Sequence, residues 1–118
     1  MRIILAASDR DLLKAYARWF EGHGIDLTTV FDAAQLQSET EARIGGICIL
    51  DEAMQLPRRD AVIGQLNENG WELITLSHEG RPDPEKQLLR HPLIPRELML
   101  VLERTINMKE ERQGTEHD

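Results

Sequence analysis

The feature that most constrains this chain is a run of four apolar residues, Ile47 to Leu50 (ICIL), that passes directly into Asp51 and Glu52. An uninterrupted apolar run of this length is typical of a β-strand that is covered on both faces, as in a parallel sheet. Charged side chains are almost never fully buried unless they are paired. We therefore expect Asp51 at the end of the strand, in or near solvent, where its carboxylate is either an ordinary strand terminus or a functional group.

Segments typical of strands and of helices alternate along the rest of the chain. Strands are predicted at 2–7, 25–30, 47–51, 71–76 and about 87–90, and helices at about 9–22, 32–43, 57–68 and 95–107. Ser8 or Asp9 can cap the first helix, and Pro95 suits the first turn of the last one. This alternation predicts right-handed crossovers and a parallel sheet with helices on both faces.

Several polar side chains follow or end these predicted strands. Ser8, Asp51, Ser77 and His91 all fall at the carboxyl ends of strands. In open sheets of this kind the functional site lies at that edge, so we expect these residues to lie near one another. His78, the residue after Ser77, is interpreted only as part of a loop.

Composition narrows the classes of function. The chain has 118 residues, enough for one domain, and its net charge of −7 disfavours binding to nucleic acid or to an anionic membrane surface. The only cysteine, Cys48, lies in the apolar run and is expected in the core. No apolar run has the length of a signal peptide or a transmembrane helix, so we expect a soluble, cytoplasmic protein.

Across roughly residues 2–107, this order of elements resembles the receiver (CheY-like) domain of two-component response regulators. The resemblance implies a flavodoxin-like three-layer sandwich with a five-stranded parallel sheet in the order 2-1-3-4-5. Asp51 stands where the family has its phosphoacceptor, and the letters DEAMQLP are similar to the family's Asp-x-x-Met-Pro turn, slightly stretched. Ser77 stands at the Thr or Ser switch position. His91-Pro92 replaces a Lys-Pro pair whose bond is typically cis, so a cis bond is expected here.

The departures from the family pattern concern the metal and the phosphoryl group. Family members end the first strand with an acidic pair that holds Mg²⁺, whereas Ala7 and Ser8 occupy those positions here. Magnesium prefers oxygen ligands from carboxylates, phosphate and water, and Asp51 alone would be a weak site. His91 replaces the family lysine. It is interpreted as a residue that fills space, with a protonated imidazole that partly replaces the ammonium as the alternative. The resemblance is therefore to a degenerate receiver, or pseudo-receiver, with no cofactor expected and Mg²⁺ weak at best.

Two segments are expected to differ from a regular receiver domain. The stretch from His78 to Gln87 contains Pro82 and Pro84 and is short for a parallel crossover, which normally needs about a dozen residues or more. We therefore expect the fourth helix to be shortened or missing. Residues 108–118 are almost wholly polar and are expected to form a disordered tail beyond a receiver-like domain at 1–107.

Three hypotheses for the function remain. The first is a stand-alone receiver-like domain in a phosphorelay, with weak or no Mg²⁺-dependent phosphorylation, that binds a sensor kinase or a downstream signalling protein and is not an enzyme. The second is a conventional single-domain response regulator phosphorylated on Asp51. The third, a small enzyme on a flavodoxin-like sheet, has less support because Ser8-Asp9-Arg10 contains no glycine loop to hold a phosphate. The sequence leaves the partner and the oligomeric state open.

Overall fold

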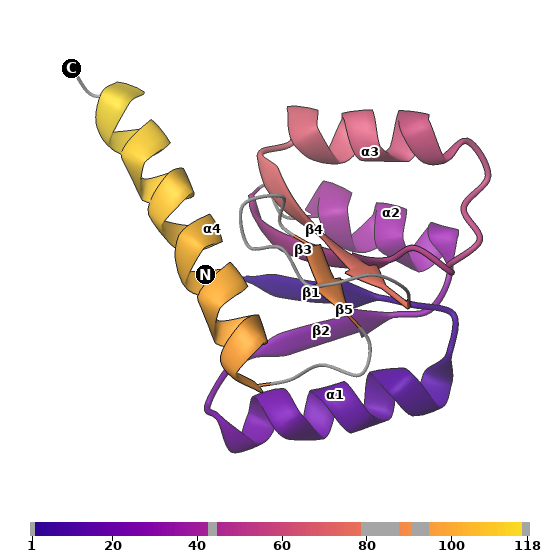
Figure 1. Ribbon diagram of the computed structural model, residues 1–118. Coiled ribbons are helices and arrows are strands. Elements are labelled where there is room, and N and C mark those ends of the chain that lie inside the picture. The colour runs from indigo at the N-terminus through magenta and orange to yellow at the C-terminus, as the bar shows by residue number, and fades with distance from the viewer. Residues whose placement is uncertain (1, 43–44, 79–87, 91–94, 117–118) are drawn as a thin grey trace.

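The computed structural model describes residues 2–42, 45–78, 88–90 and 95–116, and these form a parallel sheet with helices on both faces (Figure 1). The strands are β1 (Ile3–Ala6), β2 (Leu27–Val30), β3 (Gly46–Asp51), β4 (Trp71–Ser77) and β5 (Leu88–Arg90), and the helices are α1 (Arg10–Gly22), α2 (Ala33–Ala42), α3 (Arg59–Glu68) and α4 (Pro95–Glu116). The sheet order is β2-β1-β3-β4-β5 and every pair of neighbouring strands is parallel. The predicted α/β fold and strand order are confirmed.

Alternate residues of the central strands point into two separate cores. On one face of the sheet the core packs against α1 and α4, and its strand residues are Ile3, Leu5, Ile47, Ile49, Ile74 and Leu76. On the other face, which α2 and α3 cover, the strand residues include Ile4, Ala6, Cys48, Leu50 and Trp71. All six residues of β3 are buried, which explains why its sequence is apolar without alternation. Burial also raises the pKa of the Cys48 thiol to about 12.

Gly46, the first residue of β3, lies where no other residue fits easily. Its φ is +137°, and an added Cβ would lie 2.6 Å from the carbonyl oxygen of Arg2 and 2.8 Å from Cζ3 of Trp71. The Trp71 ring is itself buried, and its Nε1–H donates a hydrogen bond to the carbonyl of Thr40 at 3.4 Å. The start of the central strand is therefore fixed by close packing of backbone and ring.

The last helix is longer than the sequence predicts. The buried stripe of α4 is formed by Leu98, Val101, Leu102 and Thr105, but the helix continues to Glu116 and its C-terminal part projects away from the sheet (Figure 1). Residues 108–116 are thus helical, where a disordered tail was expected. Most of these residues are Met, Lys, Glu, Arg or Gln, which have high intrinsic helix propensity. None of the described helices is long and apolar enough to cross a membrane.

Two predictions fall on residues outside the described part of the chain. Strand β4 ends at Ser77 and β5 begins at Leu88, so the expected shortening of the fourth helix concerns residues 79–87. The expected cis bond concerns His91 and Pro92, which also lie outside the described residues. Within the described residues the chain forms four helices.

Candidate functional site

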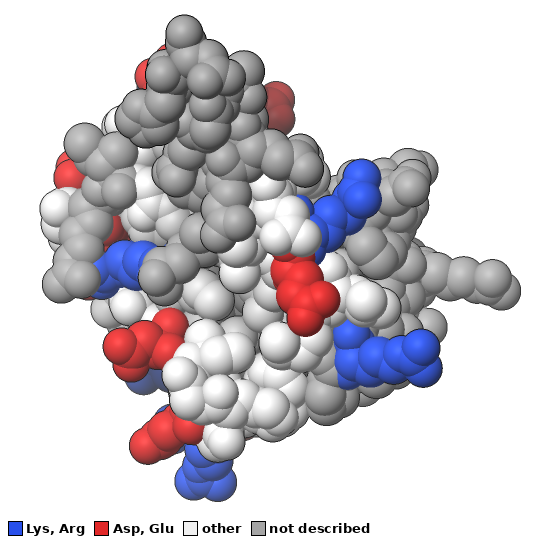
Figure 2. Space-filling model, turned by 90° about the vertical axis from the view of Figure 1, so that its left-hand side faces the viewer, with Lys and Arg blue, Asp and Glu red and all other residues white. Residues whose placement is uncertain are grey.

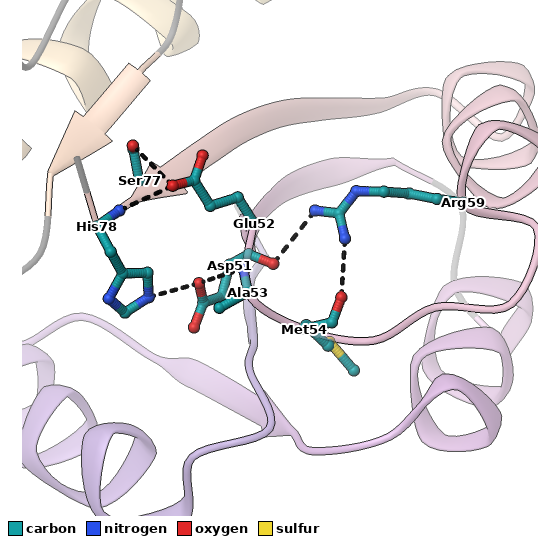
Figure 3. A network of polar contacts seen from close by, with 7 residues as sticks. All are labelled: Asp51, Glu52, Ala53, Met54, Arg59, Ser77 and His78. Atoms are coloured by element: carbon teal, nitrogen blue, oxygen red, sulfur yellow. Dashed lines mark hydrogen bonds and ion pairs between the residues drawn. The ribbon is translucent and has the colours of Figure 1, made fainter. Parts of the chain in front are cut away.

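Asp51 ends β3 at the carboxyl edge of the sheet, and it is buried. Only 2% of its surface is exposed, so the expectation that Asp51 lies in or near solvent is wrong. Its Oδ1 atom accepts a hydrogen bond from the backbone N–H of Ala53 at 2.9 Å and lies 2.7 Å from Nε2 of His78 (Figure 3). The carboxylate tolerates burial because it is paired.

His78 is the residue that the sequence analysis missed. It directly follows β4, and its imidazole reaches across the sheet edge to Asp51, while 36% of its side chain remains exposed. An ionised carboxylate can only accept hydrogen bonds, so Nε2 of the ring is the donor. The register of the sheet pairs Asp51 with Leu76 and so places the residues just after Leu76 beside Asp51. The chain order shows only that His78 follows a strand.

Glu52 points away from Asp51, as the alternation of a strand predicts. Its Oε1 atom accepts two hydrogen bonds, one from the Ser77 hydroxyl at 2.9 Å and one from the His78 backbone N–H at 3.0 Å. These contacts lower the pKa of Glu52 below its usual value, the His78 N–H first and the Ser77 hydroxyl second, with smaller contributions from the charges of His78 and Arg59. Ser77, the candidate switch residue, therefore donates to Glu52.

The loop after β3 is held by Arg59 from the first turn of α3. The guanidinium donates to the carbonyl of Met54 at 2.8 Å and to the carbonyl of Asp51 at 3.2 Å (Figure 3). Met54 is buried beneath the loop. Arg58, just before the helix, adopts a left-handed conformation with φ of 55°. Arg59 thus fixes the backbone on both sides of Glu52.

The end of β1 contributes no carboxylate from the two positions where the family resemblance places an acidic pair. Ala7 is fully buried and its N–H donates to the carbonyl of Val30, whereas Ser8 is exposed. Asp9 uses Oδ1 to cap α1 through the backbone N–H groups of Asp11 and Leu12. Among the described residues, no three His, Cys, Asp or Glu side chains lie close enough to hold a metal ion.

The candidate residues are thus brought together only in part. Asp51 and Ser77 lie at the same edge of the sheet, on neighbouring strands. Their side chains have different partners, because Asp51 bonds to His78 and Ser77 bonds to Glu52. His91 and Pro92 lie outside the described residues.

On the face that α4 covers, acidic and basic side chains are intermixed (Figure 2), and the coloured residues of this face form no continuous basic surface of the kind that binds a phosphate backbone.

The contacts of Glu52 predict a pH dependence. Because folding lowers the pKa of Glu52, this side chain stabilises the fold above its ordinary pKa of about 4.3, and that contribution is lost as the pH falls through the lowered value. Glu52→Gln is expected to lower Tm at pH 7 and to have almost no effect at pH 2. The change is small because Glu52 is exposed to solvent. Thermal unfolding at the two pH values tests it, with Glu68→Gln on α3 as the control. An equal loss of Tm at both pH values would show that charge is not involved.

Comparison with solved structures places this fold among receiver domains. The structure of the response regulator StyR is superimposable with a TM-score of 0.76 at 15% identity, covering 98% of this chain and 64% of that protein. The signal receiver domain of an HD domain-containing protein from Pseudomonas fluorescens Pf-5 gives 0.71 at 19% identity, covering 93% and 97%. A protein described as a pilus assembly protein, from Burkholderia thailandensis E264, gives 0.67 at 23% identity, covering 91% and 98%.

The likeness is one of structure. The sequence matches no protein-family model and no curated protein. At these identities the solved structures establish that the chain has the receiver-domain fold, which confirms the resemblance at the level of the fold.

Proposed function

We propose that this chain is a receiver-like domain of two-component signal transduction that acts in the cytoplasm through protein–protein contacts, with weak or no phosphorylation of Asp51. The observation that carries the proposal is the pairing of buried Asp51 with His78 at the functional edge of a receiver fold. The partner is a sensor kinase or a downstream signalling protein, and the domain is not an enzyme.

The ligand set at this edge does not suit Mg²⁺. Magnesium requires near-octahedral oxygen coordination and is usually held by one or two carboxylates together with phosphate and water. Ala7 has no ligand atom, Ser8 offers a neutral hydroxyl, and Asp51 already uses Oδ1 for two hydrogen bonds. A dianionic phosphoryl group next to Asp51 would therefore lack the divalent countercharge that makes its approach favourable. Mg²⁺ is expected to bind weakly at best.

Two alternatives differ in what supports them. A conventional regulator phosphorylated on Asp51 is supported by the positions of Asp51 and Ser77 at the ends of neighbouring strands. A small enzyme finds no comparable support. Among the described residues, a cavity of about 230 Å³ between α2 and α3 has no titratable lining side chain. A more open hollow of about 400 Å³ includes Glu21 and Asp26, which lie at the end of α1 and before β2 and not at the carboxyl edge of the sheet.

Titration of the isotope-labelled protein with Mg²⁺ and then beryllofluoride, followed by NMR, tests the proposal. At millimolar Mg²⁺ we expect no saturable change at Asp51 or Ser77, and little stable aspartyl phosphate with a small phosphodonor. The matched control is a repaired variant, Ala7→Asp with Ser8→Asp and His91→Lys, which restores two carboxylates and the ammonium. Loss of ligands of this kind should weaken Mg²⁺ by more than the roughly 10–100-fold that outer-shell changes produce.

The outcomes separate the hypotheses. If the unmodified protein is phosphorylated readily and Asp51→Asn abolishes the reaction, the chain is a conventional regulator and the proposal is wrong. If the unmodified protein does not respond and Mg²⁺ binds only to the repaired variant, the degenerate site is supported.

A further inference from the structure

We propose that two hydrogen bonds block this site, in addition to the metal ligands that it lacks. Glu52 accepts the hydroxyl of the candidate switch residue Ser77, and the His78 ring donates to the candidate phosphoacceptor Asp51. The inference rests on the proposed function, because it concerns the same site. We call the four residues Asp51, Glu52, Ser77 and His78 the clasp. Figure 3 shows that they join the end of β3 to the end of β4.

The first half of the clasp is the bond between Ser77 and Glu52. A serine hydroxyl has one proton to donate, and here it is directed to Glu52 Oε1 at 2.9 Å. Ser77 is buried, so its side chain has little room to rotate. While this bond is formed, the same proton cannot be given to a phosphoryl group on Asp51. In this structure Glu52 thus accepts the hydroxyl proton that phosphorylation would otherwise recruit.

The second half is the bond between His78 and Asp51. The ring lies 2.7 Å from Oδ1, an oxygen that also accepts the N–H of Ala53. A metal ion or a phosphoryl group at that oxygen must first displace the imidazole. Hydrogen bonds to a carboxylate are charge-assisted and about twice as strong as neutral ones, so displacing the imidazole from Oδ1 is costly.

The two halves act together because His78 takes part in both. Its ring bonds to Asp51 and its backbone N–H bonds to Glu52 Oε1. Two consecutive carboxylates, Asp51 at the end of β3 and Glu52 just after it, therefore hold two consecutive residues, Ser77 at the end of β4 and His78 just after it. The backbone N–H of Glu52 adds a bond to the carbonyl of Leu76 at 3.0 Å. These four bonds hold the end of β4, and we therefore expect the surface that it presents to a partner to form without a phosphate.

The first experiment uses the otherwise unmodified protein. Removing the acceptor with Glu52→Ala is expected to speed amide hydrogen exchange at His78 by about three- to tenfold, since a hydrogen bond to a charged group is lost at a solvated site. Glu68→Ala, at the exposed end of α3, is the control for loss of a glutamate. Unchanged exchange at His78 and unchanged NMR shifts at Ser77 in the Glu52→Ala protein would overturn the inference.

The second experiment asks whether the clasp blocks the site. In the repaired variant, further substitution of Glu52→Ala and His78→Ala is expected to raise the affinity for Mg²⁺ with beryllofluoride by at least about tenfold, because two competing charge-assisted bonds are removed. Far-UV circular dichroism confirms that both variants are folded. Equal affinity with and without the clasp would overturn the inference while leaving the proposed function intact. Adduct formation by the unmodified protein would instead contradict the proposed function.

Discussion

Gly46→Ala is expected to lower the free energy of unfolding by about 3–5 kcal/mol, because it combines backbone strain with overpacking. At φ of +137° a residue with a Cβ is strained, and the new methyl group would lie 2.6 Å from the Arg2 carbonyl oxygen and 2.8 Å from the Trp71 ring. A backbone oxygen and a buried indole cannot move aside cheaply. Urea denaturation followed by circular dichroism measures the change.

Gly64→Ala is the matched control for this substitution. Gly64 lies within α3, and an added Cβ there would meet nothing within 4 Å. Alanine should stabilise the helix by up to about 1 kcal/mol. The two glycine substitutions are therefore expected to have opposite signs. A small loss at Gly46, comparable with that of an ordinary surface substitution, would show that the start of β3 can relax around the new methyl group.

Leu98→Ala on α4 is expected to cost about 2–5 kcal/mol, the range for truncating a fully buried leucine. Leu98 has no exposed surface and belongs to the core between the sheet and helices α1 and α4. The chain offers a control two residues further along the same helix, since Leu100 is 49% exposed. Leu100→Ala should change stability by no more than about 0.5 kcal/mol. Similar losses at the two positions would mean that α4 is rotated about its axis relative to the sheet.

The fold could be predicted from the sequence because it depends on patterns within short segments. The apolar run of β3, the capping residue Asp9 and Pro95 in the first turn of α4 each act locally. The handedness rule for parallel crossovers leaves few arrangements of the resulting elements. The end of α4 was predicted poorly for the opposite reason. The apolar stripe that the sequence shows ends at Ile106, whereas the helical backbone continues to Glu116, through residues that mostly have high helix propensity.

The site was predicted only in outline, because its contacts join residues of different strands. Chain order placed Asp51 and Ser77 at one edge, but it could not show that Glu52 would take the serine hydroxyl or that the His78 ring would turn inward. The burial of Asp51 was misjudged for the same reason. An unpaired carboxylate would stay in solvent, but His78, just after β4, supplies a partner that the sequence does not show. Predicting such pairs requires the register of β3 against β4 and the side-chain rotamers at its end.

Because Cys48 is buried, the rate at which its thiol is alkylated reports local opening of the sheet. The thiol lies at the middle of the central strand, has no exposed surface, and has a pKa raised to about 12. Only the thiolate reacts with alkylating reagents, so in the native state the side chain is both inaccessible and in its unreactive form. Alkylation can proceed only when β3 separates from its neighbours. The chain contains a single cysteine, so its alkylation rate would measure how often the centre of the sheet opens. The measurement applies to the unmodified protein and to each variant and needs no added probe.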